Sequence, residues 1–192
     1  VGREVRPPVS GWFDWGGQFE NLERASARLA MIVPLVFLTI GLLLFLALRS
    51  LKDAALVFAG VPLALVGGAV ALLLRGMPFS ISAAVGFIAL SGVATLNGLV
   101  LMQAIRQRYE EGAEPLVAAV EGAVSRLRAV LTTALVAMLG FIPMAFAFGA
   151  GAEVQKPLAT VVIGGLLTAT VLTLLVLPTV AARIMDRRED PA

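Results

Sequence analysis

The sequence predicts an all-α fold: a polytopic membrane bundle of five transmembrane helices with a short extracytoplasmic N-terminal segment. Of its 192 residues, 59% are hydrophobic and the mean hydropathy is +0.93, whereas soluble domains are about 45–50% apolar. Charged residues also divide the chain into five uncharged runs, each long enough to cross about 30 Å of hydrocarbon, which takes roughly 20 helical residues. Because backbone groups in lipid must pair within the chain, long runs without alternation favour helices over barrel strands.

Composition and motifs exclude several functions. The 15 basic and 13 acidic residues give a net charge of +2, too small to indicate a nucleic-acid partner. The sequence has no Cys and no His, which excludes disulfides, thiol chemistry and the commonest zinc sites. It also contains no phosphate loop, nucleophile elbow or metal-ligand cluster. We therefore expect no enzyme, no cofactor and no metal site in these residues.

Residues 1–28 are expected to end an extracytoplasmic domain and lead into the first helix. Trp12, Trp15 and the pair Gly16-Gly17 suit a short strand and turn, although an aromatic belt at the membrane interface is an alternative. Asn21 or Ser26 is expected to cap the helix. The chain starts with Val and shows no signal peptide, so we expect it to be a piece of a longer protein.

The transmembrane bundle is expected over residues 29–183, followed by a cytoplasmic tail over 184–192. Its spans are predicted at 29–48, 54–74, 77–105, 129–152 and 157–182. One side of the bundle would carry Arg49, Lys52, Arg106, Arg108, Arg126, Arg128, Arg183, Arg187 and Arg188, and the other Arg24, Arg28, Arg75 and Lys156. The richer side should be cytoplasmic, so the N-terminus is predicted outside and the C-terminus inside.

The one long cytoplasmic connection is predicted to form an amphipathic helix over residues 115–128. Pro115 suits a helix start, and Leu116, Val120 and Val124 recur at near-helical spacing. We expect this helix to run along the inner membrane face into the fourth span. A mere connector and a coupling element both remain open.

None of the five runs contains an ionisable residue, so a titrating carboxylate of a proton pathway must lie elsewhere. The third run instead holds Asn97, nine residues or about 13 Å from Arg106 and thus near mid-membrane. Ser91 and Thr95 share a helix face, and Gly98 follows one turn later. Asn97 is either a functional group or a contact that holds helices together.

The fourth run adds a second polar group. Thr132 and Thr133 follow Arg126 by one to two turns, and Arg126 and Thr133 lie close to one helix face. With the third run they could line a wet seam between two helices. Threonines in membrane helices also commonly bond to their own backbone, which is the alternative.

Long blocks of the chain resemble a known family. GGQFENLERA, GFIALSGVATLNGLVL, SRLRAVLTTALVAMLGFIPMAFAFGAGAEVQKPLATVVIGG and LTLLVLPTV are similar to the C-terminal membrane half of resistance-nodulation-division efflux pumps, heavy-metal branch. The resemblance covers about Trp15 to Arg183. It implies the last five of twelve spans of an inner-membrane antiporter driven by the proton-motive force, with no cofactor. The implied partners are the N-terminal half of the same pump, a homotrimer, a periplasmic adaptor, an outer-membrane channel and the lipid bilayer.

The resemblance also implies residue roles. The position of Asn97 is a lysine in drug exporters and a glutamate in copper and silver exporters, and the latter have a lysine at the position of Val130, so this chain looks more like the cobalt, zinc, cadmium and nickel exporters. Arg126, Thr132 and Thr133 correspond to the region that supports the proton relay, whose acidic residues lie on the family's fourth span. Ala129 replaces a usual proline, and Thr132 a common Met, so the helix can continue unbroken. An exporter of organic molecules and a non-transporting membrane assembly protein remain alternatives.

Overall fold

The computed structural model describes residues 18–189 and confirms the all-α prediction for them. Its helices are α1 (Gln18–Leu48), α2 (Leu51–Leu74), α3 (Ile81–Glu110), α4 (Pro115–Ala145) and α5 (Ala152–Glu189). All five are long and apolar enough to cross a membrane. The strand and turn expected around Trp12 and Trp15 lie outside the described residues.

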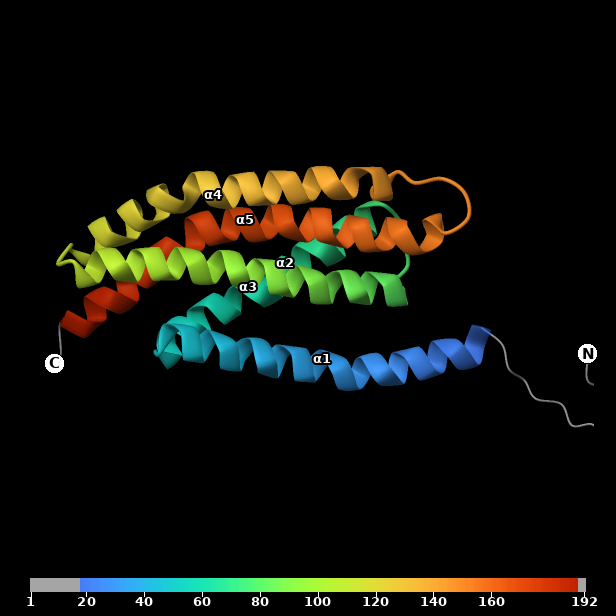
Figure 1. The fold of residues 1–192 in the computed structure, drawn as a ribbon, viewed down its shortest axis with the longest axis horizontal. Helices are drawn as coiled ribbons and strands as arrows, with labels where there is room; N and C mark the ends of the chain where they lie inside the picture. Colours follow the sequence, from blue (N-terminus) through green and yellow to red (C-terminus); the bar gives the residue numbers. More distant parts are fainter. Residues whose placement is uncertain (1–17, 190–192) are drawn as a thin grey trace, which may run out of the picture.

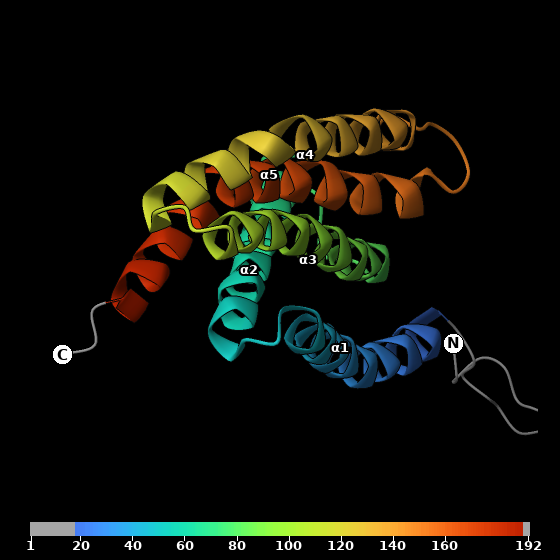
Figure 2. The same ribbon diagram turned by 60° about the vertical axis from the view of Figure 1, so that its left-hand side comes forward.

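Neighbouring helices alternate in direction, as expected when short turns join successive spans. Helices α1, α3 and α5 run one way, and α2 and α4 run the other (Figures 1 and 2). The α1–α2 and α3–α4 turns therefore lie at one end of the bundle, which we call the Arg106 end. The α2–α3 and α4–α5 connections lie at the opposite end, which we call the Arg75 end.

Local capping explains where the helices differ from the predicted spans. Ser80 Oγ accepts a hydrogen bond from the Ala83 N–H at 3.2 Å, so α3 begins at Ile81 and not at residue 77. Helix α4 ends at Ala145, because residues 146–151 form a turn with positive φ at Gly149 (96°) and Gly151 (89°). The capping prediction for Asn21 and Ser26 is wrong, since both lie inside α1.

Helix α4 is continuous across the boundary between the expected surface helix and the fourth span. It runs from Pro115 to Ala145 through residues 115–128 and on past Ala129 (Figure 1). A proline at position 129 would remove one backbone hydrogen bond and clash with the preceding turn. The unbroken helix is therefore what alanine at this position predicts.

Helix α5 packs against α2, α3 and α4, whereas among the described helices α1 contacts only α2 and α3 (Figure 2). Buried apolar side chains form two clusters along the bundle. The cluster toward the Arg75 end contains Leu72, Leu90, Val161 and Leu166. The one at the Arg106 end contains Leu44, Leu48, Val57, Leu101, Met102, Ile105, Leu177 and Met185. Helix α1 contributes only to the second cluster.

Candidate functional site

Asn97 lies in the middle of α3 and is turned into the bundle, where it is only 6% exposed. Its side-chain Nδ2 is buried and has no hydrogen-bond partner among residues 18–189. A buried donor left in this state costs about 1–3 kcal/mol, so native proteins rarely leave one without a partner. Within residues 18–189 Asn97 therefore carries an enclosed donor that is not satisfied.

The neighbouring polar groups of α3 have no such free donor. Ser91 Oγ donates to the Ile88 carbonyl and Thr95 Oγ1 to the Ser91 carbonyl, both at 2.7 Å. Gly98 lets α2 approach closely, because a Cβ at this position would lie 2.8 Å from Val57 Cγ1. The hydroxyl groups of Ser91 and Thr95 are therefore satisfied by backbone carbonyls of α3, and at Gly98 the helix packs closely against α2.

The polar residues of α4 lie on a different surface. Arg126, Thr132 and Thr133 are all exposed in the described part of the chain. Thr133 Oγ1 donates to the Ala129 carbonyl of its own helix at 2.9 Å. No hydrogen bond joins any of the three to Asn97 within residues 18–189, so the described residues do not form the wet seam by themselves.

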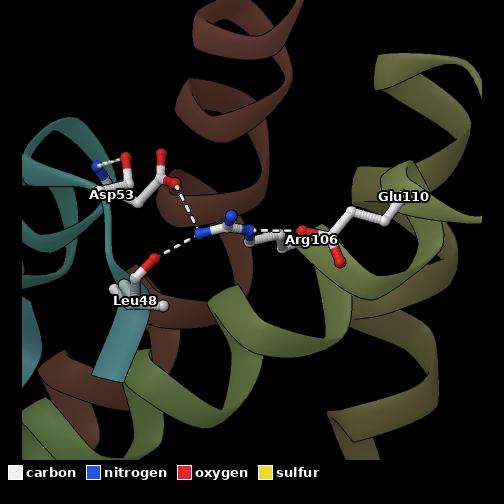
Figure 3. Close-up of polar contacts among 5 residues, drawn as sticks. Leu48, Asp53, Arg106 and Glu110 are labelled. Carbon is white, nitrogen blue, oxygen red and sulfur yellow. Dashed lines mark hydrogen bonds and ion pairs between the residues drawn. The ribbon is translucent and has the colours of Figure 1, made fainter. Parts of the chain in front are cut away.

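A cluster of charged groups at the Arg106 end was not anticipated from the sequence (Figure 3). Asp53, in the first turn of α2, is fully buried, and its Oδ2 lies 3.9 Å from Arg106 Nη1 of α3. Arg106 also donates to the carbonyl of Leu48, the last residue of α1, and through Nε to Glu110 Oε1 at 2.7 Å. One guanidinium thus contacts three helices.

Sequence reasoning missed Asp53 because charged residues served only to mark the ends of the apolar runs. A signal was present: Ser50 stands three residues before Asp53 and directly before an apolar run, which is a capping pattern. In the structure Ser50 Oγ accepts from the Asp53 N–H at 3.4 Å. That pattern places Asp53 on the first turn of α2, where a negative charge is favourable.

A second basic residue joins helices at the opposite end. Arg75 caps the C-terminus of α2 and donates to Thr160 Oγ1 of α5 at 2.7 Å and to the Ala145 carbonyl of α4 at 2.9 Å. Its guanidinium also lies 5.4 Å from the centroid of the Phe146 ring. Arg75 therefore ties the ends of α2, α4 and α5 together.

The described residues offer no evident cation site. Nowhere in residues 18–189 do three His, Cys, Asp or Glu side chains gather to hold a metal ion. A cavity of about 260 Å³ between α2, α3 and α5 is lined mainly by apolar groups, among them Val57, Leu63 and Ala94. The lining of this cavity does not supply the oxygen or nitrogen ligands that a divalent cation needs.

Comparison with known proteins gives consistent matches. The family model described as AcrB/AcrD/AcrF family matches residues 1–184. The nickel and cobalt resistance protein CnrA of Cupriavidus metallidurans is 61% identical over 188 residues, which are 98% of this chain and 18% of that protein. The cobalt-zinc-cadmium resistance protein CzcA of the same organism is 56% identical, with the same coverage of 98% and 18%. A crystal structure of a heavy metal efflux pump superposes with a TM-score of 0.80 at 50% identity, covering 96% of this chain and 18% of that one.

Proposed function

The chain belongs to the AcrB/AcrD/AcrF family, and from this premise we propose that it is the C-terminal transmembrane portion of a proton-driven pump that exports divalent heavy-metal cations. The observation that carries the proposal is the identity of 61% and 56% with relatives named for resistance to nickel and cobalt and to cobalt, zinc and cadmium. The chain spans 18% of the length of these relatives. The activity therefore belongs to the whole pump, and this chain contributes a part.

In this proposal Asn97 is the hydrogen-bonding partner of a relay carboxylate on the fourth span of the N-terminal half. The buried Nδ2 without a partner among the described residues supports this role, because an ionised carboxylate accepts such a donor. When the carboxylate takes up a proton it becomes a donor itself, and the Oδ1 of the Asn97 amide can accept its hydrogen bond. Asn97 can thus follow both protonation states without a charge of its own, while the helices shift.

The exposed polar face of α4 suits a supporting role in the same proposal. Arg126, Thr132 and Thr133 are exposed on α4, where the N-terminal half of the pump would cover them. The metal is cargo and is gripped in the periplasmic porter region, outside these spans. The N-terminus of the chain is periplasmic and its C-terminus cytoplasmic in the bacterial inner membrane. The pump works as a homotrimer with a periplasmic adaptor and an outer-membrane channel.

The experiment for Asn97 compares Asn97→Leu with the wild type in the full-length pump, expressed in metal-sensitive cells. Leucine has a similar volume but removes both the donor and the acceptor, so we expect cobalt, nickel and zinc resistance to be lost or strongly reduced at equal membrane abundance. Thr39→Val is the matched control, because Thr39 is exposed and donates only to the Leu35 carbonyl of its own helix. Unchanged resistance in Asn97→Leu would remove Asn97 from the relay.

The function as a whole is tested with the purified wild-type pump in proteoliposomes under a proton gradient. We expect added cobalt, nickel, zinc or cadmium to accelerate dissipation of the gradient as the cation is exported. Acceleration by organic molecules but not by these cations would assign the pump to a different substrate class. A gradient that no solute affects would point to a membrane assembly protein and contradict transport.

A further inference from the structure

Helix α1 is attached to the described bundle near its C-terminal end only. Between Arg24 and Leu43 no residue is buried, whereas Leu44 and Leu48 are 1% and 2% exposed and belong to the cluster at the Arg106 end. Phe37 makes an edge contact with Phe58 of α2 at 6.1 Å between ring centroids. Pro34 stands just before this attached part, and a proline weakens a helix where it lies.

The attached end of α1 is held by a polar group as well as by apolar packing. Arg106 donates to the Leu48 carbonyl at the C-terminus of α1, where helix carbonyls lack intrahelical partners and favour a positive charge. The same Nη1 lies 3.9 Å from Asp53 Oδ2 at the start of α2 (Figure 3). A planar guanidinium can serve partners in two directions, which a lysine ammonium does less well.

The turn between the two partners of Arg106 has an unusual backbone. Arg49 has φ of 49°, in the left-handed region that residues other than glycine avoid. Such a conformation persists only where its surroundings fix it. The Leu48 carbonyl lies directly before Arg49, and Asp53 lies four residues after it, so Arg106 fixes both flanks of the turn.

We propose that Arg106 is a positioning residue that locks the α1–α2 turn to α3. The lock keeps the C-terminal end of α1 in a fixed place relative to the helix that carries Asn97. A displacement of α3 is then transmitted to α1 at Leu48. The part of α1 that precedes Pro34 is not packed against the described bundle and can move with it. The step from this lock to proton coupling rests on the proposed function; the lock itself does not.

The lock is tested by distance measurements in the full-length pump. This chain has no cysteine, so Leu46→Cys on α1 and Gln103→Cys on α3, both exposed, accept spin labels once cysteines elsewhere in the pump are replaced. We expect a single narrow distance population in the otherwise wild-type protein. Arg106→Gln should add a second population or broaden the first, because the turn loses its polar contacts with α3.

Two further variants make the result specific. Arg108→Gln is the matched control, since Arg108 lies on the same helix and pairs with Glu111 at 3.2 Å and with Glu121 at 3.8 Å, neither of which belongs to α1 or α2. It should leave the distance unchanged. Arg106→Lys keeps a positive charge near Asp53, and we expect a smaller second population than in Arg106→Gln. Should Arg106→Gln not accumulate, the lysine variant decides, and a distance distribution identical to the wild type overturns the lock.

Transport gives a second readout that a purely structural role would not change. In proteoliposomes containing equal amounts of folded pump, we expect Arg106→Gln to lower the number of metal ions exported per proton, because a displacement of α3 is no longer transmitted to α1. Failure of the proposed function would appear differently, as a wild-type pump without metal-dependent proton flux. The spin-label distances would then still judge the lock, and equal distances in Arg106→Gln and the wild type would reject it.

Discussion

Asn97 and Arg106 lie nine positions apart on α3, and their surroundings differ. Asn97 is buried with a donor that no described residue accepts, whereas Arg106 contacts Leu48, Asp53 and Glu110. The sequence identified Asn97 because an amide stands out in an uncharged run. Arg106 and Asp53 look like ordinary charges at span ends, since their pairing depends on how three helices meet.

At the residue scale, the close approach of α3 to α2 and to α4 predicts a graded response to alanine at three glycines. A Cβ at Gly98 would lie 2.8 Å from Val57 Cγ1, so Gly98→Ala should destabilise the protein by about 1–3 kcal/mol. Gly122→Ala should cost more, since its Cβ would lie 2.7 Å from the Ile105 Cα, a backbone atom that no rotamer change can move. Thermal unfolding of the purified full-length pump measures both effects.

The control for this series is Gly92→Ala on the same helix. A Cβ at Gly92 has open space around it, so alanine should be neutral or stabilise α3 by up to about 1 kcal/mol through its higher helix propensity. Combining Gly98→Ala with Val57→Ala should recover part of the loss, because the clashing methyl group is removed. Equal unfolding temperatures for Gly98→Ala and Gly92→Ala would refute the close approach.

At the scale of elements, the sequence predicted the helices well and their ends less well. Long uncharged runs require spanning helices, and Ala129 allowed α4 to run unbroken from Pro115 to Ala145. The ends depend on local hydrogen bonds: Ser80 starts α3 four residues after the predicted position 77, and the glycine turn after Ala145 shortens α4. The predicted spans ended at charged residues, and Ser80, Gly149 and Gly151 carry no charge, so the pattern did not mark these helix ends.

The hydrogen bonds by which Arg75 joins α2 to α4 and α5, which we call the Arg75 joint, give a prediction about these helix ends. Arg75→Gln removes the charged donor that reaches Thr160 and the Ala145 carbonyl. We expect a loss of about 2 kcal/mol, as for hydrogen bonds made by a charged group, seen as a lower unfolding temperature. Arg128→Gln is the control, because Arg128 is exposed and makes no hydrogen bond or ion pair with a described residue. Equal unfolding temperatures for the two variants would mean that the joint does not stabilise the bundle.

At the scale of the whole molecule, the faces of α1 and α4 could not be assigned from the sequence. In the most apolar stretch of each helix, only 6% of the residues of α1 and 11% of those of α4 are buried, against 50% of those of α3. Uniformly apolar helices give no periodic signal that separates a face covered by lipid from one covered by protein. Asn97 could therefore be assigned to the third span from the sequence. That Arg126 and Thr133 lie on an exposed surface, apart from the buried Asn97, could be seen only in the structure.

The orientation of the bundle provides the last prediction. The Arg106 end contains both turns that the sequence assigns to the cytoplasm, and nine basic residues are expected on that side against four on the other. In spheroplasts with the full-length pump, a membrane-impermeant maleimide should label Ala150→Cys in the α4–α5 connection but not Glu114→Cys in the α3–α4 turn; both positions are exposed. Glu114→Cys should react only after the membrane is permeabilised. The reverse pattern would place Arg106, and with it the lock at the C-terminal end of α1, on the periplasmic side.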